Sequence, residues 1–149
     1  MPTIATRFHG ALAITDRDVI HLEQEILGFS AYRDFVLIPH REESPFLYLQ
    51  SVAEPGIAFV VMDPLLVMPD YVLPVAELPD ALLGDPRLWA VLGVCTITGA
   101  NQGTINLKSP VIINRETRRG GQFVLSLPYS FDHPLFQEAA HARTEPANQ

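Results

Sequence analysis

PFLYLQSVAEPGIAFVVMDP, which runs from Pro45 to Pro64, is the stretch that decides the fold. Residues 46–52 and 57–62 are rich in aromatic and β-branched side chains, which favour strands, and prolines bound both runs. Pro55-Gly56 suits a tight turn between them, because proline presets φ and glycine tolerates positive φ. The stretch therefore predicts an antiparallel hairpin. Both faces of its second strand are apolar, which is typical of a sandwich or barrel rather than of a sheet with one face in water.

The rest of the chain continues this pattern of short strands separated by proline and glycine. One short helix is expected within Val75 to Gly84, where Pro79 suits a first turn and Gly84 suits the end. The chain is therefore predicted to be all-β, a small irregular β-barrel with long loops and one short helix. The other strands are expected at residues 7–14 (a bent strand or a strand pair), 19–22, 34–38, 88–98, 104–107, 111–114 and 122–126.

Length and composition indicate a single domain. The chain has 149 residues, 48% of them hydrophobic, and a domain of this size buries roughly 70% of its unfolded surface. The only cysteine, Cys95, lies in an apolar run, so we expect a small buried side chain in a reducing compartment. We find no signal-peptide pattern and no run of about 18 apolar residues, and we expect a cytoplasmic, monomeric protein that does not contact a membrane. The domain is expected to cover residues 1–136, and the polar residues 137–149 to form a flexible tail.

Charge is distributed unevenly along the chain, whose net charge is −7. Between Arg41 and Arg87 there is no lysine or arginine, whereas the same interval carries eight aspartates and glutamates. Residues 108–119, by contrast, are net positive. An acidic surface repels phosphate backbones and attracts basic proteins, so direct nucleic-acid binding is disfavoured and a basic protein partner is favoured. A solvated face that only aids solubility is the alternative interpretation.

No motif in the sequence indicates catalysis or a cofactor. The five histidines form no metal-binding spacing, and there is no nucleophile elbow or phosphate-binding loop. Glu42 and Glu43 lie in a charged loop before a proline, which does not suit general acid or base work. We therefore expect no metal, no cofactor and no enzyme activity. A different function would follow if the barrel enclosed an apolar ligand or a flavin and acted as a carrier or enzyme.

Three blocks of this sequence resemble the FliW family of flagellar assembly factors. The first is the stretch from Pro45 to Pro64, and the second is TINLKSPVIIN at residues 104–114, followed by Arg118, Gly120 and Gln122. The third is Tyr129 with HPLF at residues 133–136. Two places depart from the family pattern: residues 22–29 keep Gly28 and Phe29 but lack two prolines and one glycine, and Asp132 stands where the family usually has arginine. The resemblance covers residues 3–136 and implies a small irregular β-barrel with long loops.

The resemblance also implies two protein partners. One is the C-terminal region of flagellin in the cytosol, and the other is CsrA, a small basic RNA-binding protein that represses flagellin translation. The family member freed by flagellin export binds CsrA and relieves that repression. Which surface binds which partner is left open by the sequence.

Partner binding is expected at the acidic interval of the chain. Tyr71, beside Asp70 in a proline-rich loop, has the composition of an exposed interface anchor, although it could also fold back onto its own loop. The residues expected to bind a partner are Glu42, Glu43, Asp63, Pro64, Asp70 and Tyr71.

Overall fold

The structure of the protein is a computed structural model, and it describes residues 3–136. The predicted tail at residues 137–149 lies outside the described residues. The strands are β1 (Thr3–Ala5), β2 (Ala11–Ala13), β3 (Ile20–Gln24), β4 (Asp34–Pro39), β5 (Leu47–Ser51), β6 (Ala58–Met62), β7 (Trp89–Gly99), β8 (Gln102–Ile105), β9 (Val111–Asn114), β10 (Arg119–Gln122) and β11 (His133–Pro134). Between them lie the helix α1 (Asp80–Leu83) and four 3-10 turns, η1 (Asp16–Asp18), η2 (Pro64–Leu66), η3 (Val75–Glu77) and η4 (Pro86–Leu88).

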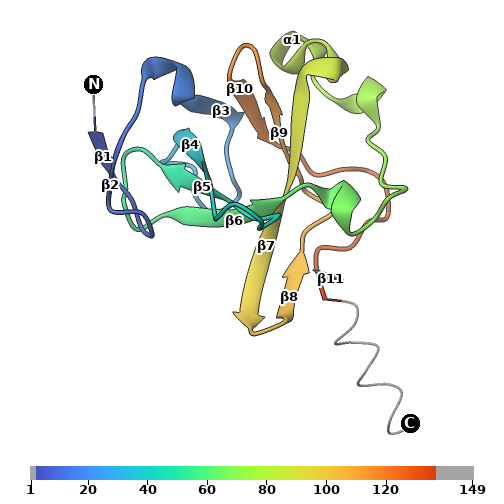
Figure 1. Cartoon of the computed structure of the whole chain (residues 1–149). Helices are drawn as coiled ribbons and strands as arrows, with labels where there is room; N and C mark the ends of the chain where they lie inside the picture. Colours follow the sequence, from blue (N-terminus) through green and yellow to red (C-terminus); the bar gives the residue numbers. More distant parts are fainter. Residues whose placement is uncertain (1–2, 137–149) are drawn as a thin grey trace, which may run out of the picture.

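One large sheet closes on itself through its longest strand. The strands follow the order β11-β8-β7-β6-β5-β4-β3-β10-β9, and β9 also pairs with β7, so that the strands from β7 to β9 form a ring. Strand β7 serves two neighbours on one edge, because Trp89 to Leu92 pair with β9 and the residues from Cys95 onward pair with β8. Figure 1 shows β7 running along the whole molecule, with β8 and β11 extending from its far end. The predicted all-β barrel is confirmed.

The hairpin predicted from the opening stretch is present as β5 and β6. The two strands pair antiparallel from Leu47 opposite Val61 to Gln50 opposite Ala58. The turn between them is closed by the Ile57 amide, which donates to the Glu54 carbonyl at 3.1 Å. The helix is confirmed too: α1 ends at Leu83, and the next residue, Gly84, has a φ of 63°, a conformation that glycine adopts without strain.

Aliphatic and aromatic side chains fill the interior of the ring. Phe35, on β4, is fully buried and its ring packs against Phe59 of β6 at a centroid distance of 6.1 Å. Because side chains fill the interior of the closed sheet in this way, a solid core is favoured over the ligand cavity that a carrier would need. The buried members of this cluster are Ile20, Leu22, Ile26, Phe35, Leu49, Val61, Leu92, Val111 and Ile113.

Strand β10 differs from its prediction. The sequence predicts strands at 111–114 and 122–126, which leaves Gly120 and Gly121 in the turn between them, but β10 begins at Arg119 and contains both glycines. A Cβ on Gly120 would lie 2.1 Å from the Ile112 backbone oxygen, so only glycine allows β9 and β10 to approach this closely. The two glycines therefore belong to the sheet and not to the turn. The turn is made instead by Arg118, whose φ is 63°.

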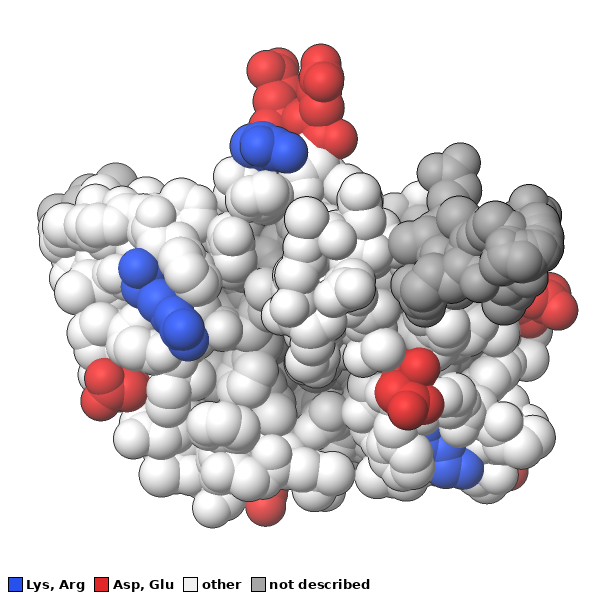
Figure 2. Space-filling view, turned by 90° about the horizontal axis from the view of Figure 1, so that it is seen from below, with Lys and Arg blue, Asp and Glu red and all other residues white. Residues whose placement is uncertain are grey.

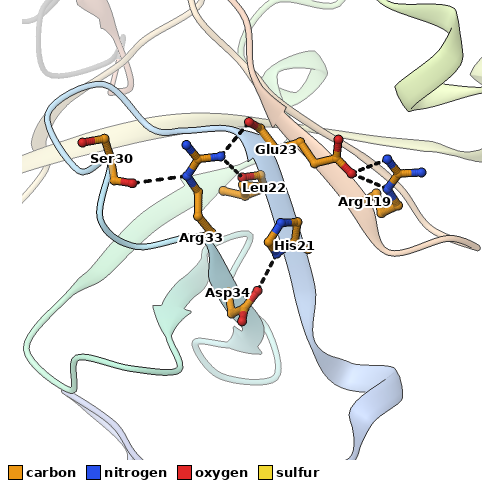
Figure 3. A network of polar contacts seen from close by, with 7 residues as sticks. All are labelled: His21, Leu22, Glu23, Ser30, Arg33, Asp34 and Arg119. Carbon is orange, nitrogen blue, oxygen red and sulfur yellow. Dashed lines mark hydrogen bonds and ion pairs between the residues drawn. The ribbon is translucent and has the colours of Figure 1, made fainter.

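Polar contacts tie the ring together where β3 lies beside β10, the only parallel pair of the described sheet. Arg33 donates to the Glu23 carbonyl at 2.7 Å, and Arg119 pairs with the Glu23 carboxylate from the opposite side (Figure 3). His21 on β3 faces Asp34 on β4, with 2.7 Å between His21 Nδ1 and Asp34 Oδ1. These exposed contacts hold the loop between β3 and β4, the region where the sequence departs from the family pattern.

Candidate functional site

The chain that leaves β6 forms a proline-rich segment, residues 63–75, over one edge of β7. Asp63 caps the turn η2 by accepting a hydrogen bond from the Leu65 amide at 2.9 Å, and Pro64 is buried at the first position of that turn. A proline at this position is preorganised for a helical turn and removes an amide that would lack a partner. The turn projects Leu65 and Leu66 outward, where 49% and 61% of their surfaces are exposed.

Tyr71 anchors the proline-rich segment from the inside. The expectation of an exposed Tyr71 is wrong, because only 7% of its surface is accessible. Its hydroxyl donates to the Leu107 carbonyl at 2.8 Å, which lets the polar tip of the ring enter the core. Burial raises the pKa of the Tyr71 phenol well above its usual value. The alternative interpretation, a tyrosine folded back onto its own loop, does not describe it either, because the ring enters the core and contacts Tyr129 and the Leu107 carbonyl.

Tyr129 holds the same segment from the surface, a role that the sequence analysis missed. Its ring lies against Tyr71 at a centroid distance of 4.6 Å. Its hydroxyl accepts from the Val72 amide at 2.9 Å and donates to the Val72 carbonyl at 3.1 Å. A further tie with no apparent signal in the sequence lies just after the segment, where Ser126 donates to the Glu77 carboxylate at 2.6 Å. The segment is thus fixed at several points along its length.

A pocket of about 410 Å³ lies between the proline-rich segment and β7. Strand β7 forms one wall of the pocket. The pairing of β6 with β7 ends at Met62 opposite Gly93, so within residues 3–136 the part of β7 before Gly93 has no strand on that edge and pairs only with β9 on the other. Most of the lining is apolar, and Asp63 is its one carboxylate. The residues that line the pocket are Asp63, Pro64, Leu65, Tyr71, Val72, Leu73, Val75, Pro86, Trp89 and Val91.

Glu42 and Glu43 lie at the same end of the sheet as Asp63. They belong to the loop between β4 and β5, and the register places Pro39 opposite Leu47 and Leu47 opposite Val61. The loop therefore emerges where β6 ends. Phe46, at the base of this loop, packs into the same core cluster as Tyr71. The register thus places Glu42, Glu43, Asp63 and Pro64 at one end of the sheet, and Asp70 and Tyr71 follow in the proline-rich segment that leaves this end.

The carboxylates at this end have no cationic partner within residues 3–136. The ion pairs in this part of the protein join His21 to Asp34, Arg33 to Glu25, Arg87 to Asp85 and Arg119 to Glu23. None involves Glu42, Glu43, Asp63 or Asp70. Figure 2 shows one face of the molecule on which a few acidic and a few basic side chains are scattered over a largely uncharged surface. On that face, the charges are separate groups of both signs, and the carboxylates form no continuous acidic surface.

The positively charged residues of 108–119 serve the fold. Lys108 donates to the Leu127 carbonyl at 2.7 Å, and Arg115 donates to the carbonyls of Arg87 and Leu88 at 2.8 and 3.2 Å. Arg118 donates to the Asp18 carbonyl at 3.1 Å. These contacts bind loops to the barrel, which gives the basic stretch a structural role.

Two further features bear on the class of site. Residues 3–136 contain no group of three histidine, cysteine, aspartate or glutamate side chains placed to hold a metal ion. Cys95 is buried, as predicted, and burial raises the pKa of its thiol to about 12. A thiol with so high a pKa is a poor nucleophile at neutral pH. Among the same residues, no helix has the length and apolar character that crossing a membrane requires.

Comparison with known proteins gives the family. The sequence model described as "FliW protein" matches residues 3–135. The chain belongs to the FliW family. The flagellar assembly factor FliW of Geobacillus kaustophilus is 36% identical over 144 residues, covering 91% of this chain and 96% of that protein. The corresponding protein of Bacillus subtilis is 33% identical over 140 residues, covering 91% and 98%. A crystal structure of the flagellar assembly factor FliW matches with a TM-score of 0.83 and 32% identity, over 91% of this chain and 97% of that one.

The polar residues that carry the FliW resemblance form turns of the barrel. Asn106 accepts from the amides of Lys108 and Ser109, at 3.0 and 2.9 Å. Asn114 accepts from two amides of the β9–β10 turn and donates to the Leu83 carbonyl at 2.8 Å. Gln122 donates to the Ser109 carbonyl at 3.0 Å. These polar residues of the shared blocks therefore have structural roles, whereas most residues that line the pocket at the proline-rich segment lie outside the blocks.

Proposed function

We propose that this protein is a cytoplasmic, non-catalytic flagellar assembly factor that acts by exchanging protein partners. It binds the C-terminal region of flagellin, and when free of flagellin it binds CsrA and relieves the repression of flagellin translation. The partners are those implied by membership of the FliW family, and the relatives named above are flagellar assembly factors.

The observation that carries the proposal is the group of unpaired carboxylates at one end of the barrel. Glu42, Glu43, Asp63 and Asp70 are exposed, and none forms an ion pair within the described part of the chain. Such charges attract a basic protein and speed its association. Pro64 and Tyr71 act as positioning residues, since they are buried and set the course of the segment that carries Asp63 and Asp70.

The test combines two charge changes at this end. Asp63→Asn keeps the oxygen that caps η2, and Asp70→Lys reverses an exposed charge. We expect the double variant to bind CsrA about 3- to 10-fold more weakly in low salt, mainly through a slower association rate, because exposed charges contribute about 0.2–1 kcal/mol each. The difference should shrink at high salt, where the charges are screened.

A matched control carries the same change in net charge at other places. Asp16→Asn and Glu54→Lys alter two exposed carboxylates, one in η1 and one in the β5–β6 turn at the opposite end of those strands. Calorimetry and stopped-flow association should show near-native CsrA binding for this control. Equal weakening by both double variants would mean that only the net charge matters and would refute this location of the site.

A further inference from the structure

The pocket at the proline-rich segment has the features of a site for a side chain and not only of a surface hollow. It combines apolar walls from η2, the following loop, η4 and β7 in a volume of about 410 Å³. The walls are rigid, because Tyr71 is fixed by the Leu107 carbonyl and Trp89 donates to the Leu83 carbonyl at 2.9 Å. A preformed apolar hollow of this kind loses little entropy when a group enters it.

The rim of the pocket is apolar and unusually exposed. Leu65, Val72 and Val75 line the pocket, and their exposed fractions are 49%, 60% and 46%. Leu66, beside them on η2, is 61% exposed. Adjacent exposed aliphatic side chains around a concavity are characteristic of a protein interaction site.

The charge beside the rim restricts the occupant. Asp63 is part of the lining and Asp70 immediately precedes Tyr71, and both carboxylates are exposed and lack an ion-pair partner within residues 3–136. No lysine or arginine lies between Arg41 and Arg87 to neutralise them. An acidic segment would be repelled here, whereas a cationic group next to the entering side chain would be attracted.

We infer that the pocket receives one bulky aliphatic or aromatic side chain from a partner protein, presented by a segment in which lysine or arginine lies next to it. The basic residues pair with Asp63 and Asp70 while the apolar side chain fills the hollow between Val72 and Trp89. This inference rests on the proposed function, because it assigns the partner-binding site a chemical specificity.

The only tryptophan of the chain lines the pocket and therefore reports its occupancy. The probe is a blocked peptide in which one leucine is flanked by lysines in a serine–glycine background. Two matched peptides replace the leucine by alanine or the lysines by glutamates. Binding is followed by Trp89 fluorescence and by the Trp89 indole N–H signal in NMR spectra. We expect the leucine–lysine peptide to shift both signals, and each matched peptide to bind at least tenfold more weakly.

Variants of the protein separate the pocket from general attraction between opposite charges. Val72→Ser removes an exposed apolar group from the rim, and Val124→Ser makes the same change at a valine that is also 60% exposed but does not line the pocket. We expect Val72→Ser to lower the affinity for the leucine–lysine peptide at least fivefold and Val124→Ser to leave this affinity unchanged. Equal binding of the leucine and alanine peptides, or equal effects of the two variants, would overturn the inference.

Two further outcomes distinguish this inference from the proposed function. If CsrA and flagellin bind the native protein but neither responds to Val72→Ser, the proposed function stands and the pocket assignment is wrong. If the unliganded protein forms a dimer that Val72→Ser abolishes, the occupant is a second copy of this chain, which also overturns the inference.

Discussion

Replacing Tyr71 by phenylalanine tests how the proline-rich segment is held. The change keeps the ring, so it creates no cavity against Tyr129 or the surrounding core. It removes the hydroxyl that donates to the Leu107 carbonyl at 2.8 Å, and Leu107 is fully buried. A buried carbonyl that loses its donor costs about 1–3 kcal/mol. A loss of 2 kcal/mol in a domain of this size lowers Tm by roughly 4–8 °C.

The measurement is urea unfolding followed by the fluorescence of Trp89. The midpoint should fall with an unchanged m-value, because the surface exposed on unfolding is the same. Tyr129→Phe is the matched control: its hydroxyl bonds to the Val72 backbone at an exposed place, where water can replace it, so the cost should stay near 0.5 kcal/mol. An unchanged midpoint for Tyr71→Phe, or a larger loss for Tyr129→Phe, would refute the argument that the buried hydrogen bond fixes the segment.

Three other predictions concern the barrel. Gly120→Ala would place a Cβ 2.1 Å from a backbone oxygen of β9, so we expect the free energy of unfolding to fall by about 3 kcal/mol or more. Gly56→Ala, in an open turn, should change it by less than about 1 kcal/mol, and equal unfolding midpoints for the two variants would contradict the close approach of the strands. Cys95→Ser should lower the free energy of unfolding, measured with denaturant, by about 1 kcal/mol, near the low end of the cost of burying a hydroxyl. The cost is low because the Gly93 carbonyl lies 3.6 Å from the sulfur and can accept a hydrogen bond from the serine; a gain in stability would contradict the buried position of residue 95. The pKa of the Cys95 thiol is near 9 in the unfolded chain and about 12 in the folded protein, so the unfolded state loses its proton first and stability should fall as the pH rises between these values, by about 1.4 kcal/mol at pH 10. A Cys95→Ala variant that shows the same decrease at that pH would assign it to other groups.

The barrel could be predicted from the sequence because its signals are local. Strands β5 and β6 are bounded by prolines and joined by Pro55-Gly56, and β9 was predicted with its observed limits, Val111–Asn114. The position of β10 could not be predicted in this way. Two adjacent glycines usually indicate a turn, and only the neighbouring backbone of β9 shows that this strand requires them.

The candidate site was predicted less completely, since it depends on contacts between distant residues. The acidic interval between Arg41 and Arg87 indicated Asp63 and Asp70, but the spacing of the prolines does not indicate that Tyr71 reaches the Leu107 carbonyl, 36 residues away. The pocket is likewise formed by chain segments that meet only in the fold, from Pro64 on η2 to Val91 on β7.

The exchange of partners is the central claim, and a competition experiment tests it most directly. Purified CsrA is first bound to this protein, flagellin is then added in increasing amounts, and the CsrA that remains bound is measured by analytical size exclusion. The account predicts that CsrA forms a complex with the protein and that flagellin releases it in a saturable manner. If neither CsrA nor flagellin binds, or if both remain bound together at saturation, the proposed exchange is contradicted.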